Sequence, residues 1–304
     1  MNLIMTKFLL FGLFCIVCLS GKSQENNPES NLIENGATVT KVASGYAFTE
    51  GPSVAQDGRV FFTDQPNDKI FIWNEKDNSI STFLESTEKS NGTYFNKKGE
   101  LVCCADLNNR LIAFSMDKKM KVLAENFDGK HLNGPNDLWI NPKNGGIYFS
   151  DPYWPRVYWE KDHREVQDKR AVYYLQPNGK VIRVIDDFKS PNGLVGPPDG
   201  KTLYASDMGD RKIWKYDIQA DGTLSNKTLF APEGADGMTI DNLGNVYLAS
   251  RGISVYGPDG KSLTKIKVPG NVTNMCFGGK KRNILFITGG NSVYTLKMSV
   301  KGVE

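Results

Sequence analysis

The feature that most constrains the fold is a turn-plus-strand pattern that recurs six times along the chain. Each copy has a Gly, Asp or Asn turn followed by alternating apolar residues, and most copies have a second alternating run behind the first. Such alternation, rich in aromatic and β-branched residues and repeated every ~40–55 residues, is typical of β-strands in a repeat architecture. The copies are "QDGRVFFTD" from 56, "KKGELVCCAD" from 97, "PKNGGIYFSD" from 142, "PDGKTLYASD" from 198, "NLGNVYLAS" from 242 and "GKKRNILFIT" from 279.

Six repeats of about four strands each predict an all-β, six-bladed β-propeller. The last repeat ends after its third strand, near Met298, while residues 37–46 form an unassigned strand at the other end. We therefore expect this N-terminal strand to complete the last blade and close the ring. A two-domain β-sandwich is the structural alternative, but it does not explain the even period.

The first residues are typical of a secretory signal peptide. Lys7 precedes "FLLFGLFCIVCLS", an apolar run of about 13 residues that is too short to span a bilayer comfortably. Cleavage is expected near Ser23, which predicts a signal peptide over 1–23, a flexible segment over 24–36 and one propeller domain over 37–304. Lipoprotein anchoring at Cys18 is less favoured, because Val17 is not the small residue a lipobox requires. The mature chain is expected in the periplasm or outside the cell, without a membrane span.

Composition excludes several classes of function. The chain has 37 Lys and Arg against 34 Asp and Glu with no long basic run, so nucleic acid is not an expected partner. His131 and His163 are the only histidines, which excludes a three-His zinc site and disfavours a Ser-His-Asp triad. Cys103, Cys104 and Cys276 are expected to be buried thiols and not a disulfide framework. A monomer or a weak dimer is expected.

Aligning five repeats on their turn glycines, and the last repeat by its strand end at Thr288 because it lacks that glycine, brings out one shared polar position. In a propeller this position lies at the start of the innermost strand, which lines the central channel, so six polar side chains should converge near the axis. Carboxylate and amide oxygens suit Ca²⁺, and suit Mg²⁺ or Mn²⁺ less well. Asn and Asp are also common at turns before strands, but six in one register are hard to assign to turn chemistry. The residues are Glu50, Asn91, Asp137 with Asn136 beside it, Asn192, Asp236 and Asn274.

A long loop over residues 151–170 follows the second strand of the third blade and should return to the same end of the channel. It contains Tyr153, Trp154, Arg156 and His163 among other aromatic and charged residues. Long loops in compact folds are usually functional or disordered. This loop is expected to form a lid and a sugar-stacking wall, with Tyr153, Trp154 and His163 on the substrate; an Ω-like surface loop packed on itself is the alternative.

The same segments resemble the SMP-30/gluconolactonase/LRE-like family over nearly all of the mature chain. The matching motifs include "TEGPSV", "LNGPNDLWINP", "SPNGLVGPPDG" and "GADGMTIDNLG". The resemblance implies a six-bladed propeller with one divalent cation, usually calcium, with Mg²⁺, Mn²⁺ or Zn²⁺ as alternatives. It implies that Glu50, Asn136, Asn192 and Asp236 hold or border this cation, and that the reaction is hydrolysis of a sugar lactone. The 151–170 loop is longer and more charged than the usual family segment, which bears on substrate identity.

The expected activity is that of a gluconolactonase-like carboxylic-ester hydrolase. A cation would polarise the ester carbonyl, and Asp236 would position and deprotonate the attacking water, with activation of the water by the cation as a variant. Asn91, Asn136 and Asn274 would hold substrate oxygens. Two alternatives stay open: hydrolysis of aryl esters or organophosphates at the same metal site, and a non-catalytic ligand-binding propeller with a structural ion. Strictosidine-synthase-like propellers lack the acidic ring, so Glu50 and Asp236 count against them.

Overall fold

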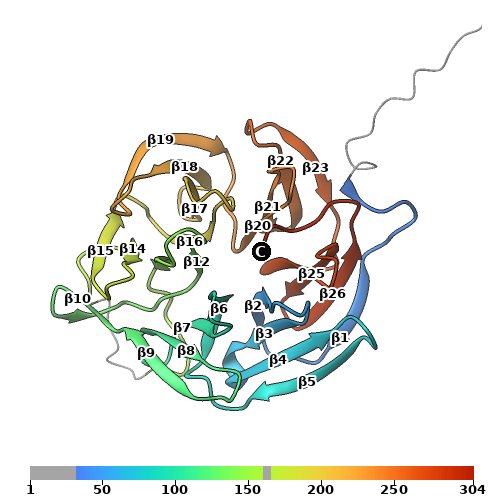
Figure 1. Cartoon of the computed structure of the whole chain (residues 1–304), viewed down its shortest axis with the longest axis horizontal. Helices are drawn as coiled ribbons and strands as arrows, with labels where there is room; N and C mark the ends of the chain where they lie inside the picture. The colour runs from blue at the N-terminus through green and yellow to red at the C-terminus, as the bar shows by residue number, and fades with distance from the viewer. Residues whose placement is uncertain (1–31, 160–165) are drawn as a thin grey trace, which may run out of the picture.

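The computed structural model describes residues 32–159 and 166–304, and it confirms the six-bladed β-propeller. Six four-stranded antiparallel sheets surround a central axis, with the innermost strand of each blade beside it (Figure 1). The predicted signal peptide, residues 1–23, lies outside the described residues. Within the described part of the chain, no helix is long and apolar enough to cross a bilayer.

The blades follow one another along the chain, and the first five run from the innermost strand outward. The first blade is β2 (Thr49–Val54), β3 (Val60–Asp64), β4 (Lys69–Asn74) and β5 (Ser79–Leu84), with a short 3₁₀ turn, η1 (Gln65–Asn67), after β3. The second is β6 (Ser90–Phe95), β7 (Leu101–Ala105), β8 (Arg110–Phe114) and β9 (Met120–Ala124). The third is β12 (Leu138–Ile140), β13 (Ile147–Asp151), β14 (Ala171–Leu175) and β15 (Val181–Ile185), preceded by the hairpin of β10 (Asn126–Phe127) and β11 (Lys130–His131). The fourth is β16 (Pro191–Val195), β17 (Thr202–Asp207), β18 (Lys212–Ile218) and β19 (Leu224–Ala231). The fifth is β20 (Met238–Ile240), β21 (Val246–Ser250), β22 (Gly252–Tyr256) and β23 (Ser262–Ile266).

The last blade confirms the predicted closure. It combines β24 (Asn274–Gly278), β25 (Ile284–Gly289) and β26 (Ser292–Lys297) with β1 (Thr40–Ser44), which pairs antiparallel with β26. Residues 24–36 were expected to be flexible; of these, 32–36 are described and pack on the last blade. Leu32 is buried, and Ile33 forms a β-bridge with Met298.

The apolar core lies between the blades. Successive residues of a strand point to opposite faces, so each inner strand packs on both neighbouring blades and is apolar on both faces. Phe61 packs toward the second blade, whereas Phe62 packs toward the last blade. Likewise Cys103 faces the first blade and Cys104 the third. Both thiols are buried and free, as is Cys276, which agrees with the expectation from the sequence.

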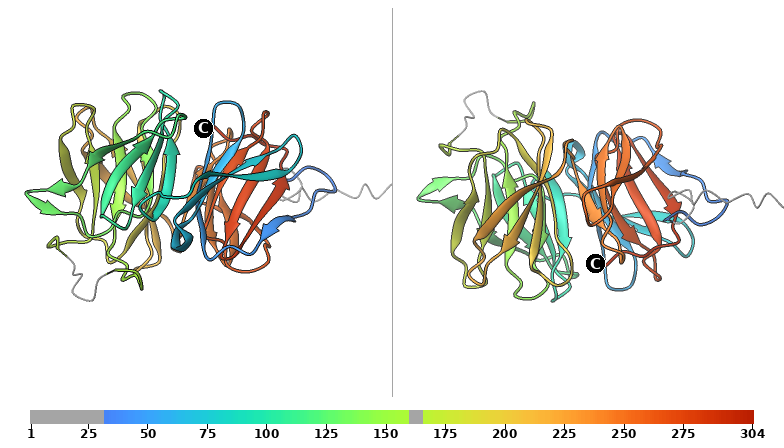
Figure 2. Two further views of the ribbon diagram at one scale, coloured as in Figure 1. Left: turned by 90° about the horizontal axis from the view of Figure 1, so that it is seen from below. Right: turned by 90° about the horizontal axis from the view of Figure 1, so that it is seen from above.

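The chain ends close to the central axis (Figure 1). Its contacts with the turn after β20 place it at the end opposite the start of the innermost strands. Residues 299–304 cross the turns that join first and second strands, where Gly302 forms a bridge with Asp241. Arg282 connects this tail to the last and first blades, which meet where the ring closes. It donates to the carbonyls of Glu304 (3.1 Å) in the tail, Gly279 (3.1 Å) in the last blade and Ala55 (2.8 Å) in the first blade. A cavity of about 840 Å³ lies beside the tail, lined in part by Tyr94 and Trp139. The side views show the blades edge-on, with the chain end at one face (Figure 2).

Candidate active site

The six polar positions from the sequence lie where the innermost strands begin, at the other end of the channel. Glu50, Asn91 and Asn192 are the second residues of β2, β6 and β16, and Asn274 is the first residue of β24. In β2, β6 and β16 the pairing register with the second strand shifts just after or around this position. A β-bulge of this kind re-aims a side chain and is common beside functional sites. The bulges therefore turn these side chains out of the sheet surface.

In the third blade, the residue equivalent to Asp236 is Asn136, and not Asp137 as the count from the turn glycine indicated. The backbone N–H groups of Asn136 and Asp236 donate to equivalent carbonyls of their second strands, at 2.9 and 3.0 Å. The count failed because the third-blade turn is wider, with Gly145 N–H donating to the Asn141 carbonyl four residues earlier. Asp137 is therefore an additional buried carboxyl group in the position where four other blades have glycine.

Neighbouring blades connect the ring residues in pairs. Asn192 Nδ2 donates to Asp236 Oδ1 at 2.8 Å, and Asn274 Nδ2 donates to Glu50 Oε2 at 3.1 Å. Asn274 Oδ1 accepts from the Met275 N–H at 2.8 Å, so both ends of this amide are engaged within the protein. In this structure Asn274 therefore orients Glu50, and its contact with substrate stays a prediction.

Asn91 keeps a buried acceptor without a partner. Its Oδ1 is fully buried and makes no hydrogen bond among the described residues. Leaving a buried acceptor unpaired costs about 1–3 kcal/mol, and such atoms in native structures call for an explanation, such as a ligand or ion. The Asn91 amide therefore has an oxygen available for a ligand at the ring, and its role in substrate binding stays a prediction.

The carboxyl groups of the ring are too close to one another to ionise independently. Burial, and then the charges of Asp236 and Asp137, raise the pKa of Glu50 well above its ordinary value. Burial raises the pKa of Asp236 to about 6, against the hydrogen bond from Asn192 and the charge of Arg156. Burial also raises the pKa of Asp137 to about 8. Three such groups in one channel favour the binding of a cation, because buried carboxylates without a counter-charge are strongly disfavoured.

A cation at this end would need amide as well as carboxylate oxygens. The described residues hold no group of three or more His, Cys, Asp or Glu side chains placed to bind a metal ion. The carboxylates of Glu50 and Asp236 and the amide of Asn192 come together at this end, and Asn136 occupies the equivalent position of the third blade. The Asn192 amide donates its Nδ2 to Asp236, which leaves its Oδ1 as an acceptor. Glu50, Asn136 and Asn192 are buried, whereas Asp236 keeps partial solvent exposure.

The 151–170 loop is anchored over the second blade by Asp106. This carboxyl group has an exposed side-chain fraction of 2%. Its Oδ2 accepts from Arg156 Nε at 2.8 Å, from Gln65 Nε2 at 3.1 Å and from the Tyr158 hydroxyl. The Asp106 carbonyl also accepts from Trp159 Nε1 at 2.9 Å. Asp106 is therefore the residue through which the loop is held close to the ring.

The loop residues expected on the substrate have different surroundings. Tyr153 stacks on Trp159, with ring centroids 5.8 Å apart, and has a left-handed backbone with a φ of 61°. Trp154 is 37% exposed. His163 lies outside the described residues. Tyr153 thus packs within the loop, as the Ω-loop alternative expects, although Arg156, Tyr158 and Trp159 fasten the described part of the loop to the second blade.

Sequence reasoning missed Asp106, although a signal was present. Asp64 and Asp207 end the second strands of their blades, and each accepts hydrogen bonds from the backbone just before its inner strand. The equivalent residue in the second blade is Ala105, which pairs with Ser90 as Asp207 pairs with Pro191. The carboxylate in "CCAD" is thus displaced by one residue, and it accepts hydrogen bonds from the loop side chains of Arg156 and Tyr158.

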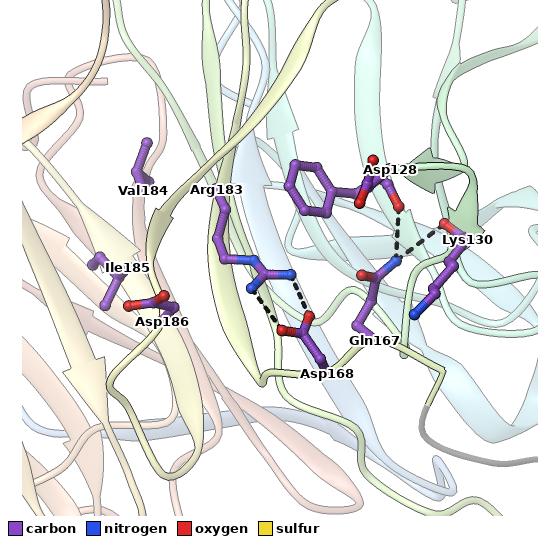
Figure 3. A pocket seen from close by; sticks show the side chains of 9 residues that line it. Asp128, Lys130, Gln167, Asp168, Arg183, Val184, Ile185 and Asp186 are labelled. Carbon is purple, nitrogen blue, oxygen red and sulfur yellow. Dashed lines mark hydrogen bonds and ion pairs between the residues drawn. The ribbon is translucent and has the colours of Figure 1, made fainter.

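The other end of the loop is held on the outside of the third blade. Asn133 Oδ1 accepts from the N–H groups of Val166 and Gln167, each at 2.9 Å, so this side chain shapes the loop. Gln167 Nε2 donates to the carbonyls of the β10–β11 hairpin, and Arg183 pairs with Asp168 at 2.5 Å. Gln167, Asp168 and Arg183 are among the residues that line a hollow of about 640 Å³ (Figure 3). It lies at the outermost strand, β15, and is separate from the ring.

Comparison with known proteins agrees with this architecture. The profile of the SMP-30/gluconolactonase/LRE-like region matches residues 48–291. A gluconolactonase from Zymomonas mobilis is 28% identical over 93% of this chain and 87% of its own length. The structure of a gluconolactonase from Xanthomonas campestris superposes with a TM-score of 0.80 at 26% identity, covering 89% of this chain and 92% of that one. The diisopropyl-fluorophosphatase of Loligo vulgaris is 28% identical over 51% of this chain and 54% of its own.

Since the profile covers most of the chain, including every inner strand, the protein belongs to the SMP-30/gluconolactonase/LRE-like family. The sequence resemblance is thereby confirmed.

Proposed function

We propose that this member of the family is a hydrolase that opens a sugar lactone at the ring of oxygen donors. The observation that carries the proposal is the convergence of two carboxyl groups, Glu50 and Asp236, with the amides of Asn136 and Asn192 at one end of the channel. The similarity to gluconolactonases over nearly the whole chain supports a lactone as substrate. The signal-peptide pattern of residues 1–23 supports action in the periplasm or outside the cell.

The proposal includes one divalent cation, with Ca²⁺ favoured because the donors are hard oxygens without imidazole or thiolate. Glu50, Asn136, Asn192 and Asp236 would hold it. Mg²⁺, Mn²⁺ and Zn²⁺ are the alternatives. When bound, a divalent cation supplies a Lewis acid that polarises the ester carbonyl and favours the negative charge that develops on its oxygen.

The residues of the chain have separate tasks in this proposal. Asp236 acts as the general base, because its Oδ1 is held by Asn192 and its Oδ2 remains for a water molecule. Its partial solvent exposure lets water approach, unlike the buried Glu50. Asn91 directs its unpaired Oδ1 at a hydroxyl group of the substrate. Asn274 keeps Glu50 in place and is a positioning residue.

The test is lactone hydrolysis by the purified protein, with glucono-1,5-lactone and a small panel of aldonolactones, with and without a chelator. Turnover that the chelator stops and Ca²⁺ restores is expected. Asp236→Asn should keep most of the calcium affinity measured by calorimetry and lose about 10²- to 10⁴-fold in turnover. Full activity of this variant would remove Asp236 from the reaction, and no turnover of any lactone by the calcium-loaded protein would overturn the proposed substrate class.

A second candidate is hydrolysis of an aryl ester or an organophosphate at the same ring. The similarity to diisopropyl-fluorophosphatase over half of the chain supports this second candidate activity. Turnover of such substrates, with none for lactones, would identify this activity. Calcium binding without turnover of either class would instead indicate a ligand-binding propeller with a structural ion.

A further inference from the structure

We propose that Arg156 selects substrates that carry an anionic group, a carboxylate or a phosphate, in addition to the lactone. This inference rests on the proposed lactone hydrolysis and extends it to the class of lactone. It starts from the ion pair of Arg156 with Asp106, one of the contacts that fasten the 151–170 loop to the second blade.

The ion pair uses only one edge of the guanidinium group. Arg156 Nε donates to Asp106 Oδ2 at 2.8 Å. Among the described residues, no hydrogen bond involves the two terminal nitrogens, Nη1 and Nη2, although the side chain is only 21% exposed. A guanidinium group has five N–H donors in a planar fork that matches carboxylate and phosphate oxygens in pairs. Arg156 thus retains donors suited to a second anion.

Asp106 holds the guanidinium group in a fixed position. The same Oδ2 accepts from Gln65 and from the Tyr158 hydroxyl, and the Asp106 carboxylate is nearly fully buried. Burial and the charge of Asp106 raise the pKa of Tyr158, so the hydroxyl stays protonated and donates. Because its Nε edge is held, Arg156 loses less rotamer freedom on binding a ligand than a free surface arginine would.

Arg156 lies at the ring end of the channel, because its partner Asp106 packs beside two segments that lead into ring residues. The Asp106 N–H donates to the Lys89 carbonyl at 3.4 Å, two residues before Asn91, and Asp106 Oδ1 lies 3.1 Å from the place of a Cβ atom on Gly134, two residues before Asn136. Lys89 adds positive charge nearby, with its Nζ 5.3 Å from the centre of the Tyr158 ring. A substrate anion beside Glu50, Asp137 and Asp236 would be repelled without such a counter-charge, which explains why a cation on this loop would favour anionic lactones.

The experiment compares kcat/KM for glucono-1,5-lactone, a glucarolactone with a free carboxylate, and 6-phosphogluconolactone. The wild type is expected to prefer one or both anionic lactones, which identifies the anion as carboxylate or phosphate. Arg156→Gln should raise KM for the preferred lactone roughly tenfold to hundredfold, the range of a hydrogen bond to a charged group, and change the neutral lactone little. Arg156→Lys should recover part of the preference through charge alone. Arg59→Gln, which removes an exposed ion pair with Asp57 far from the loop, is the control.

Ionic strength gives a second readout that a merely structural role would not move. With the wild type, kcat/KM for the anionic lactone should fall as salt rises, because mobile ions screen charge attraction; with Arg156→Gln this slope should flatten. Equal effects of Arg156→Gln on neutral and anionic lactones would overturn the inference.

Binding of the open-chain acids separates the inference from the proposed reaction. Glucarate and 6-phosphogluconate carry a second anionic group that gluconate lacks, and all three are stable ligands for calorimetry. Tighter binding of one of them than of gluconate, lost in Arg156→Gln, would support the role of Arg156 even if no lactone were hydrolysed. Equal binding of all three acids by the wild type would overturn it, whatever the outcome of the lactone assays.

Discussion

Gly237 is the position where adding one methyl group most directly perturbs the ring. It follows Asp236 and lies against Asn274 of the next blade. A Cβ atom on Gly237 would lie 1.9 Å from Asn274 Cγ, 2.0 Å from its Oδ1 and 2.4 Å from its Nδ2. Since attractive contact between carbon atoms begins near about 3.5 Å, the Asn274 side chain must move by more than about 1 Å. The 3.1 Å hydrogen bond to Glu50 cannot survive that movement.

Two costs follow from Gly237→Ala. Inserting a methyl group into a packed site costs about 1–3 kcal/mol, which corresponds to a fall in Tm of about 2–4 °C per kcal/mol in a domain of this size. Glu50 also loses the donor that orients it. Loss of a group that orients a metal ligand typically weakens metal binding by about 10- to 100-fold, so calcium affinity should fall by that factor if Glu50 is a ligand.

A double-mutant cycle with Asn274→Ala isolates the clash. In that background the amide is absent, and Gly237→Ala should cost less than about 0.5 kcal/mol or even stabilise the fold, because alanine restricts the unfolded chain and Gly237 does not have a left-handed backbone. Thermal unfolding and calcium calorimetry on the four proteins are the assays. Additive losses of stability would refute the geometry described for this pair, and an unchanged calcium affinity in Gly237→Ala would refute the proposed role of Glu50 as a ligand.

The tail supplies two further predictions. Arg282→Ala removes hydrogen bonds to carbonyls of the first blade, the last blade and the tail, so it should cost about 1–3 kcal/mol, seen as a lower Tm with unchanged calcium affinity; an unaltered Tm would argue against this clamp. Burial raises the pKa of Glu304 from 4.5 to about 7, so the stability it contributes is complete below pH 4.5 and is lost as pH rises through about 7. The Tm should fall less steeply between pH 4.5 and 7 for Glu304→Gln than for the wild type. An equal dependence of Tm on pH in the two proteins would contradict the burial of this carboxyl group.

The blades, the closure and the ring of polar residues were predictable from the sequence because the same pattern of turn and strand recurs in six repeats. Each repeat gives an independent indication of where the inner strand begins. The third blade was misaligned by one residue because its turn is wider. A count along the chain does not detect an extra residue in a turn, so it reached Asp137 instead of Asn136. The orientation of Asn274 was beyond the sequence for another reason. Residue type gives the atoms of an amide, and only the neighbouring N–H of Met275 and the carboxylate of Glu50 determine where they point.

Contacts that do not recur from blade to blade could not be predicted from the sequence. Arg156 and Asp106 are 50 residues apart, and the path of one loop brings them together. The tail over residues 299–304 has no strand alternation, yet it fills one end of the channel because the last blade ends beside it. Such contacts depend on where the closed ring places unrelated segments, so they emerge only once the whole ring is known.

The closure of the ring and the geometry of the site depend on each other. Glu50 belongs to the first blade and its partner Asn274 to the last, so their contact exists only while these two blades are joined. The join passes directly beside them: Thr49 N–H donates to the Gly290 carbonyl at 2.7 Å, and Thr273 Oγ1 donates to the Thr49 carbonyl at 2.8 Å. Opening this seam would remove the Asn274 donor and leave the Gly51 N–H as the remaining described donor to Glu50, which is costly for a buried carboxyl group. Pairing of β1 with β26 therefore does more than stabilise the fold, because it keeps the most deeply buried acid of the ring aligned with the other donors.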